Sequence, residues 1–228
     1  TAYEILTCDW SSDVCSSDLE SPTFSGFQVL AGFTPGNRAT NLTNAATSAK
    51  PRVMSLGATY RQGPLRIGLG YEEHQEFGNV GGKNDDKAWA IAARYTFANK
   101  FTIGGSYIDA KYETSTTTEL KKKNWMVGVD WAIQGPHGLE AAYTEAGDSK
   151  GNSPIGIGAT IAPSGPDTGA KIFSIKYRYS FSKRTVARIG YVKLKNDANS
   201  FYELGGTLEP TGDGQNQDAI VLFLSHTF

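Results

Sequence analysis

Charged side chains that alternate with apolar ones are the residues of this sequence most able to do chemistry. The candidates are Arg61, Arg66, Arg94, Asp130, Glu140, Lys176, Arg178 and Arg188. Because successive side chains of a β-strand point to opposite faces, such residues would share one wet face of a sheet. Rows of opposite charge along a water-filled passage set a transverse field that selects ions by sign and hydration. If this face lines water, the pattern predicts passive conduction.

Other chemistry has little support in the sequence. His74, His137 and His226 have no Cys, Asp or Glu at metal-ligand spacing, so neither a zinc site nor a catalytic triad is predicted. The glycine-rich residues 156–165 do not match a phosphate-binding loop. The 22 basic and 23 acidic residues are balanced, which gives no nucleic-acid footprint. We expect no enzymatic activity, no cofactor, no metal and no nucleic-acid partner.

The elements that must position the charges are short strands. In Lys171–Phe181, apolar Phe173, Ile175 and Tyr177 alternate with Ser174 and Lys176. The same period of two predicts about ten strands. They lie at 24–33, 53–61, 65–72, 88–97, 101–112, 124–131, 139–144, 171–181, 185–195 and 219–228. The longest purely apolar run, Ala219–Leu224, is far shorter than the roughly 20 residues of a spanning helix.

The connections between these strands alternate between long and short. Tight turns are expected at 62–64, 98–100, 134–138 and 182–184, with long polar segments after the other strands. A transmembrane β-barrel has such an asymmetry because its loops differ between the two sides of the bilayer. We therefore predict an all-β, antiparallel transmembrane barrel with long loops on one side. A small closed barrel with an adhesin or structural role and a soluble β-sandwich that binds a partner are the alternatives.

Aromatic residues provide a second signal for a membrane. Four lie at or near the tight turns, and three lie six residues beyond the start of a strand that leaves a turn. They are Tyr60, Phe97, Trp131 and Phe181 in the first group and Tyr71, Tyr107 and Tyr191 in the second. Rings at two heights are typical of the two membrane–water interfaces of a barrel.

Four segments carry a resemblance to a known family. They are "SPTFSGFQVLAGF" (21–33), "YRQGPLRIGLGY" (60–71), "YSFSKRTVARIGYVKLKN" (179–196) and the terminal "DAIVLFLSHTF" (218–228). Together they resemble the Gram-negative general porins, particularly the trimeric type of neisserial and Burkholderia-like bacteria. The resemblance covers residues 21–228, and its C-terminal motif is the most specific part.

The resemblance implies a sixteen-stranded barrel in the outer membrane, of which residues 20–228 would be the C-terminal part. It implies a homotrimer in lipid, a channel for ions and small hydrophilic solutes, and recognition of the last strand by the barrel assembly machinery. The residues of that assembly signal would be Leu222, Leu224, His226 and Phe228. The family's constricting loop would precede these strands, so ion selectivity is not carried over.

The first nineteen residues differ from the rest of the chain. They contain both cysteines, Cys8 and Cys15, and they lack the basic start and apolar core of a signal peptide. Residues 9–18 match the translation of a common sequencing-library adapter, and residues 1–4 match its outer end. We expect residues 1–19 to be disordered and of non-native origin.

Overall fold

The computed structural model describes residues 3–9, 14–34, 52–76, 85–158, 161–205 and 213–227. Within these ranges every regular element is a β-strand, and no helix is long and apolar enough to cross a membrane. The strands are β1 (Tyr3–Asp9), β2 (Val14–Glu20), β3 (Phe27–Thr34), β4 (Arg52–Gln62), β5 (Leu65–Gln75), β6 (Asp86–Phe97), β7 (Phe101–Glu113), β8 (Glu119–Ala132), β9 (His137–Ala146), β10 (Lys150–Gly151), β11 (Ala170–Ser180), β12 (Thr185–Asn196) and β13 (Gln217–His226).

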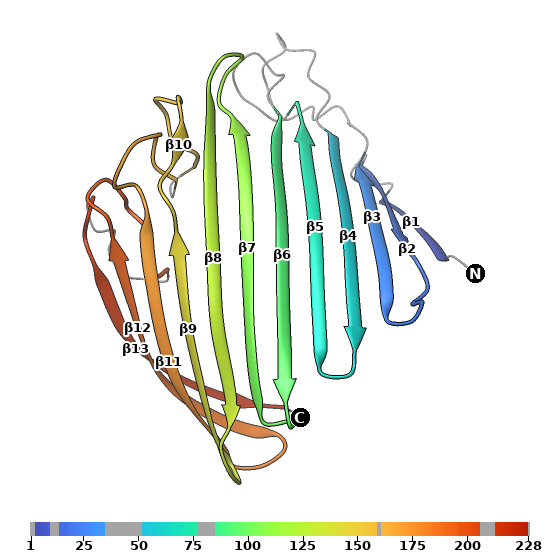
Figure 1. Cartoon of the computed structure of the whole chain (residues 1–228), viewed down its shortest axis with the longest axis vertical. Coiled ribbons are helices and arrows are strands. Elements are labelled where there is room, and N and C mark those ends of the chain that lie inside the picture. The colour runs from blue at the N-terminus through green and yellow to red at the C-terminus, as the bar shows by residue number, and fades with distance from the viewer. Residues whose placement is uncertain are drawn as a thin grey trace.

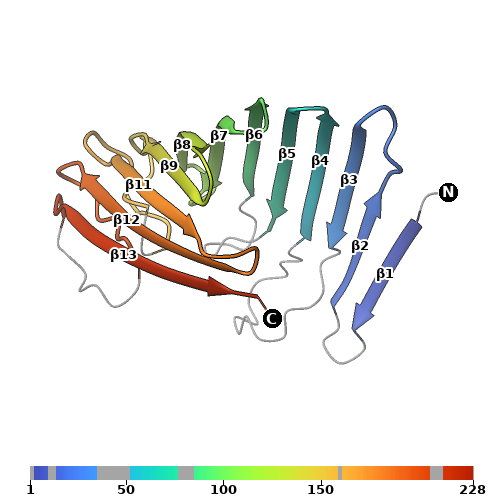
Figure 2. The ribbon, with the colours of Figure 1, turned by 90° about the horizontal axis from the view of Figure 1, so that it is seen from below.

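The strands form one antiparallel sheet in which neighbours in sequence are neighbours in space (Figure 1). The order runs from β1 to β9 and on through β11, β12 and β13, while the two-residue β10 pairs with β8. Figure 2 shows the sheet as an arc with β1 and β13 at its two ends. The predicted all-β antiparallel fold is confirmed, and the ten predicted strands correspond to β3–β9 and β11–β13.

The period-two pattern sets the faces of the sheet. In β11, Phe173, Ile175 and Tyr177 are exposed on one face, while Ser174 and Lys176 point to the other. This strand pairs residue by residue with β9 and with β12. A slip of one residue would exchange the faces, so the strict alternation fixes the register.

Tight turns join the strands at one edge, the lower edge of Figure 1. They lie between β4 and β5, β6 and β7, β8 and β9, and β11 and β12. Ala98 and Asn99 both have positive φ, at 47° and 57°, as a two-residue hairpin turn requires, and Gly63 and Gly135 adopt positive φ in two other turns. We call this the short-turn edge and the opposite one the long-loop edge.

One predicted connection is shorter in the structure. The sequence indicates a loop over residues 111–123, but β7 and β8 continue beyond the rest of the sheet and leave only residues 114–118 between them. Lys121–Lys123 therefore belong to a strand and not to a loop–strand junction. The extension is stabilised by a further pairing, because β10 pairs with the start of β8.

Two further strands lie near the start of the chain. The described backbone forms the β1–β2 hairpin, and β2 continues the sheet by pairing with β3. The disorder and non-native origin expected for residues 1–19 stay predictions. Antiparallel pairing requires only backbone hydrogen bonds, so a segment without apolar alternation can still extend an open edge.

The sheet lacks the two-sided core of a soluble sandwich. Its large apolar side chains are exposed along most of the strands, for example Leu222 at 74%. The most deeply buried large side chains of the described residues are Leu120, Lys122 and Leu194, and all three lie near the long-loop edge. An apolar face of this size is stable only when something other than water covers it.

Candidate functional site

All eight predicted pore-wall residues lie on one face of the sheet. Side-to-side pairing links Arg61 to Arg66 and Arg66 to Arg94 on β4, β5 and β6. Further along, Asp130 on β8 pairs with Glu140 on β9, which pairs with Lys176 on β11, and Arg178 pairs with Arg188 on β12. Strand β7 contributes Thr102 opposite Asp130 and Gly104 opposite Arg94. We call this side of the sheet the charged face.

Three arginines lie next to one another at one end of this band. Arg61, Arg66 and Arg94 are exposed, and among the described residues none of them forms an ion pair. Like charges opposite each other on neighbouring strands destabilise a sheet. A row of this kind is tolerated where water and counter-ions reach it, which indicates a wet face rather than a packed one.

A network of ion pairs occupies the other end of the band. Nη1 and Nη2 of Arg178 donate to the two carboxylate oxygens of Asp130, both at 3.2 Å. This two-pronged geometry holds a guanidinium in one orientation. Nη1 of Arg178 also donates to Glu140 at 3.4 Å. The Arg178 side chain is 23% exposed, so it lies along the wall rather than projecting from it.

Glu140 is the centre of this network. Its carboxylate lies 2.8 Å from Nζ of Lys176, 3.4 Å from Nη1 of Arg178 and 3.7 Å from Nε of Arg188. One carboxylate thus holds three cations from two neighbouring strands. A hollow of about 550 Å³ connects the two ends of the band, with Arg66 and Arg94 on one side and Glu140 and Lys176 on the other.

Three glycines make room for the basic side chains, and sequence reasoning missed them. A Cβ atom at Gly138 would lie 2.7 Å from Nη2 of Arg178, and one at Gly190 would lie 2.6 Å from Cγ of Lys176. A Cβ at Gly104 would lie 3.1 Å from Cβ of Arg94. Each glycine is on a strand next to its basic residue, so the signal becomes readable only when the register is known.

The opposite side of the sheet, the apolar face, has aromatic rings at two heights. The seven predicted interface aromatics all belong to it or to the turn next to it, and further rings fill the gaps between them. Toward the long-loop edge lie Tyr71, Trp89, Tyr107, Trp125, Tyr143, Phe173 and Tyr191. Toward the short-turn edge lie Tyr60, Phe97, Phe101, Trp131, Tyr179 and Phe181. We call these the upper and lower girdles.

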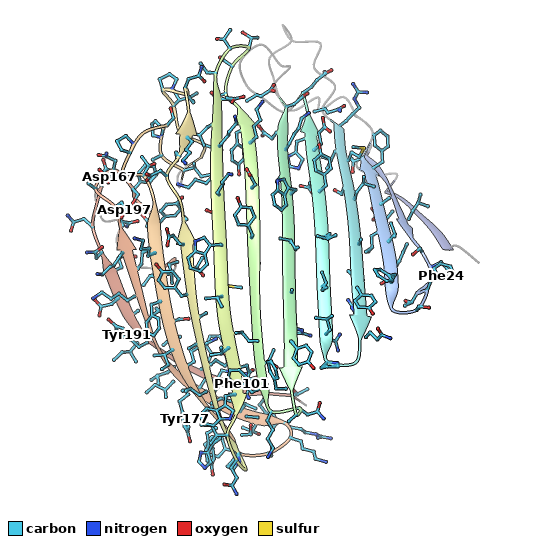
Figure 3. All side chains as sticks on the ribbon, in the orientation of Figure 1. Phe24, Phe101, Asp167, Tyr177, Tyr191 and Asp197 are labelled. Carbon is cyan, nitrogen blue, oxygen red and sulfur yellow. The ribbon has the colours of Figure 1, made fainter. Side chains whose placement is uncertain are left out.

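The rings of each girdle contact one another. In the upper girdle the ring centroids of Trp89 and Tyr107 are 5.2 Å apart, and those of Trp125 and Tyr143 are 5.3 Å apart. In the lower girdle Phe97 lies 6.1 Å from Phe101. Figure 3 shows Phe101 near the short-turn edge and Tyr191 well above it.

The two girdles are separated by several residues along each strand. Trp125 and Trp131 are six residues apart on β8, and Trp89 and Phe97 are eight residues apart on β6. At about 3.3 Å per residue this is roughly 20 to 26 Å along the strand. Strands of outer-membrane barrels are tilted by about 35–45°, so the height between the girdles is roughly 14 to 22 Å, within the apolar band of about 25 Å.

The last strand differs from the others because it is apolar on both sides, since Val221 and Phe223 are exposed on the charged face beside Gly190 and Arg188. Leu222 and Leu224 are exposed on the apolar face of β13. Nδ1 of His226 lies 2.8 Å from Oγ1 of Thr185, its register partner on β12. Phe228, the fourth residue of the predicted assembly signal, lies outside the described residues. The described part of the chain contains no cluster of three or more His, Cys, Asp or Glu residues able to hold a metal ion.

Comparisons with known proteins agree with this geometry. Residues 17–199 match the family model of the Gram-negative porins. An outer membrane porin of Bordetella pertussis is 25% identical in an alignment of 193 residues that covers 73% of this chain and 48% of that protein. The chain therefore spans about half the length of this relative.

Solved structures share the fold. The anion-selective porin from Comamonas acidovorans has a TM-score of 0.77 at 21% identity, over 94% of this chain and 59% of that one. The trimer form of OmpT, an outer membrane protein of Vibrio cholerae, has a TM-score of 0.65 at 13% identity, over 93% of this chain and 64% of that one. Because the family model covers most of its length, the chain belongs to the family of Gram-negative porins, antiparallel β-barrel proteins of the outer membrane.

Proposed function

We propose that this chain is part of a passive, non-enzymatic diffusion channel for ions and small hydrophilic solutes. The observation that carries the proposal is the contrast between the two faces of one sheet. The charged face has the eight-residue band, and the apolar face has two aromatic girdles at different heights. With the apolar face in lipid, the charged face lines water, so its charges act on permeating solutes.

The charge balance of the band favours anions. Arg61, Arg66 and Arg94 have no carboxylate partner among the described residues, while Asp130 and Glu140 are already held by cations. Uncompensated positive charge on a wall raises the local concentration of anions. The structural neighbour from Comamonas acidovorans, which shares the fold, is described as anion-selective.

We further propose that residues 20–228 form the C-terminal part of a sixteen-stranded barrel that assembles as a homotrimer. Within residues 20–228 the sheet runs from β3 to β13, and lipid does not tolerate unpaired strand edges at its two ends. Further strands would close the barrel, in agreement with the 59% coverage of the longer Comamonas protein. Outer-membrane lipid and the barrel assembly machinery, acting on Leu222, Leu224, His226 and Phe228, are the proposed partners.

Residues 1–19 have a separate proposed origin. The match to the family model begins at residue 17, close to the expected boundary at residue 20. We propose that a translated sequencing adapter precedes the porin segment. The nucleotide sequence tests this directly, since codons for residues 9–18 that differ from the adapter would refute it.

The channel function is tested in a planar lipid bilayer. The complete protein encoded by the native gene is reconstituted, and current is recorded under a salt gradient. Large, stepwise open conductances and a reversal potential on the anion side are expected. A folded, heat-modifiable protein that gives no current would refute the channel and favour the small closed barrel with a structural role.

A further inference from the structure

The charged face is covered at its long-loop edge. Leu120, Lys122 and Leu194 are 0%, 1% and 0% exposed. By alternation, Lys122 shares its face with Asp130 on β8, and Leu194 shares its face with Arg188 on β12. On the same strands, lysines of the opposite face such as Lys123 are exposed. What covers the sheet here therefore lies on the charged side.

The cover is built from two connections. Residues 147–158 and 161–169 are the described part of the connection from β9 to β11, which includes β10, and residues 197–204 follow β12. We call these two segments together the inner cap. They contact each other, because the backbone N–H of Asn199 donates to the carbonyl of Asp167 at 2.8 Å and its side chain donates to the carbonyl of Pro166 at 3.0 Å. Figure 3 shows Asp167 and Asp197 close together near the long-loop edge.

Lys122 is the point where β8 meets both segments. Its ammonium donates to the carbonyl of Thr168 at 2.9 Å and to Oγ of Ser149 at 3.3 Å. It also lies 5.3 Å from the ring centroid of Tyr202. The buried Ser149 in turn donates its N–H to Oγ1 of Thr168 at 2.7 Å. A buried lysine is uncommon, and burying its ammonium is costly unless hydrogen-bond acceptors surround it, so these contacts hold the two segments at Lys122.

Other contacts attach the cap to the β7–β8 hairpin. Oγ1 of Thr114 donates to Oγ of Ser153 at 2.8 Å in a buried contact. The Asn152 side chain accepts from the N–H of Glu119 at 2.9 Å and donates to the carbonyl of Thr117 at 3.1 Å. A loop with this many specific bonds occupies one position.

We propose that the inner cap is a fixed obstruction that narrows the long-loop entrance of the channel, and that Lys122 is the residue that positions it. This inference rests on the proposed channel function. The cap packs on the side of the sheet that would line the passage. It therefore reduces the cross-sectional area that is open to solutes. Solute size at this entrance is then decided by the cap as well as by the barrel wall.

The test compares Lys122→Ala with Lys121→Ala in the complete protein. Lys121 is the neighbouring residue, and its side chain is exposed on the apolar face, where it forms an ion pair with Glu119 at 2.7 Å. Lys121→Ala therefore removes an equal charge and keeps the backbone pairing of this residue with Lys150 of the cap. For Lys122→Ala we expect higher and noisier open-channel current, faster entry of large sugars into liposomes, and about a tenfold rise in proteolysis within residues 150–166. Lys121→Ala should behave like the unaltered protein.

A covalent rescue separates positioning from general destabilisation. The side chains of Thr114 and Ser153 point at each other, with their hydroxyl oxygens 2.8 Å apart, so Thr114→Cys/Ser153→Cys is the pair chosen for a disulfide. In the Lys122→Ala background, oxidation of this pair should restore the original conductance and sugar exclusion, and a reductant should abolish the rescue. Recovery independent of the redox state would overturn the inference.

A deletion keeps the inference testable if Lys122→Ala does not assemble. The N–H of Gly165 donates to the carbonyl of Ser149 at 2.9 Å, so a Gly-Gly link can replace residues 150–164. This variant should conduct more current than the unaltered protein. Equal conductance and equal sugar exclusion would refute the proposal that the cap narrows the entrance. If the unaltered protein itself gives no current, the proposed function fails and not the cap.

Discussion

Reversal of two arginines on the charged face should change the ion preference of the channel. Arg66 and Arg94 are register partners on β5 and β6, are exposed, and form no ion pair among the described residues. The double variant Arg66→Glu/Arg94→Glu replaces two positive charges by two negative ones. Since Asp130 and Glu140 already compensate two cations of the band, the wall would lose its excess of positive charge.

The size of the effect follows from Coulomb's law. A unit charge about 5 Å from a permeating ion in water contributes ~0.8 kcal/mol, so two reversals change the energy of a monovalent ion by ~3 kcal/mol before screening. A Debye length of about 10 Å at 0.1 M salt leaves about half of this. Because ~1.4 kcal/mol corresponds to a factor of ten, the cation-to-anion permeability ratio should rise at least about tenfold.

The assay is the reversal potential of the complete protein in a planar bilayer at 0.1 M and at 1 M salt. The shift toward cations should be large at 0.1 M and much smaller at 1 M, where the Debye length is about 3 Å. The matched control is Lys193→Glu/Lys195→Glu, because both lysines are exposed on the apolar face of β12 and carry the same charge change. An equal shift in the control, or none in the arginine variant, would refute our assignment of the faces.

Three further predictions test other parts of the structure. Gly138→Ala should displace the guanidinium of Arg178 from the carboxylates of Asp130 and Glu140 and lower the stability of the protein by about 1 kcal/mol. The loss should appear as a lower temperature at which the protein changes its migration on gels. An unchanged temperature would contradict the close contact between residue 138 and Arg178. Leu222→Lys should lower the free energy of unfolding of the barrel in lipid by about 2–4 kcal/mol, as measured by urea unfolding. Val221→Lys, on the charged face, should lower it clearly less. Equal losses would contradict our assignment of the two faces of β13. Burial raises the pKa of Tyr202 from 10.0 to about 12, so the neutral phenol stabilises the cap below pH 10, and this stabilisation is lost as pH rises through 12. The ionisation of Tyr202 is measured as the difference in ultraviolet absorbance between the unaltered protein and Tyr202→Phe during a pH titration. A midpoint near pH 10 would contradict this prediction.

The sequence alone predicts the strands and their faces well. Alternation of side chains is a local property, so residues such as Tyr177 and Arg178 reveal their opposite faces without any knowledge of their neighbours. The tight turns are equally local, since Gly63 and Gly135 adopt the positive φ that their turns require. These signals predict ten strands and the two faces of the sheet, which the structure has, while the roles of the charged residues in a pore and of the aromatic residues at a membrane stay predictions.

Extended strand ends were less accessible to sequence reasoning. Lys121–Lys123 look like a polar loop because three consecutive charges show no alternation between apolar and polar residues. In the structure, Lys122 is buried by the cap while Lys121 and Lys123 remain exposed on the other side. The groups that receive the buried ammonium, Oγ of Ser149 and the carbonyl of Thr168, lie 27 and 46 residues further along the chain.

The tertiary structure alone decides which residues meet across strands. The sequence contains Arg178, Asp130, Glu140 and Gly138, but only the register of β8, β9 and β11 brings the guanidinium to both carboxylates and leaves it room beside a glycine. Register depends on the sum of many cross-strand pairs and turn geometries and not on any single residue. For the same reason, alternation determined that this protein has a wet and an apolar face, while long-range pairing decided where its charges compensate one another and where a loop covers them.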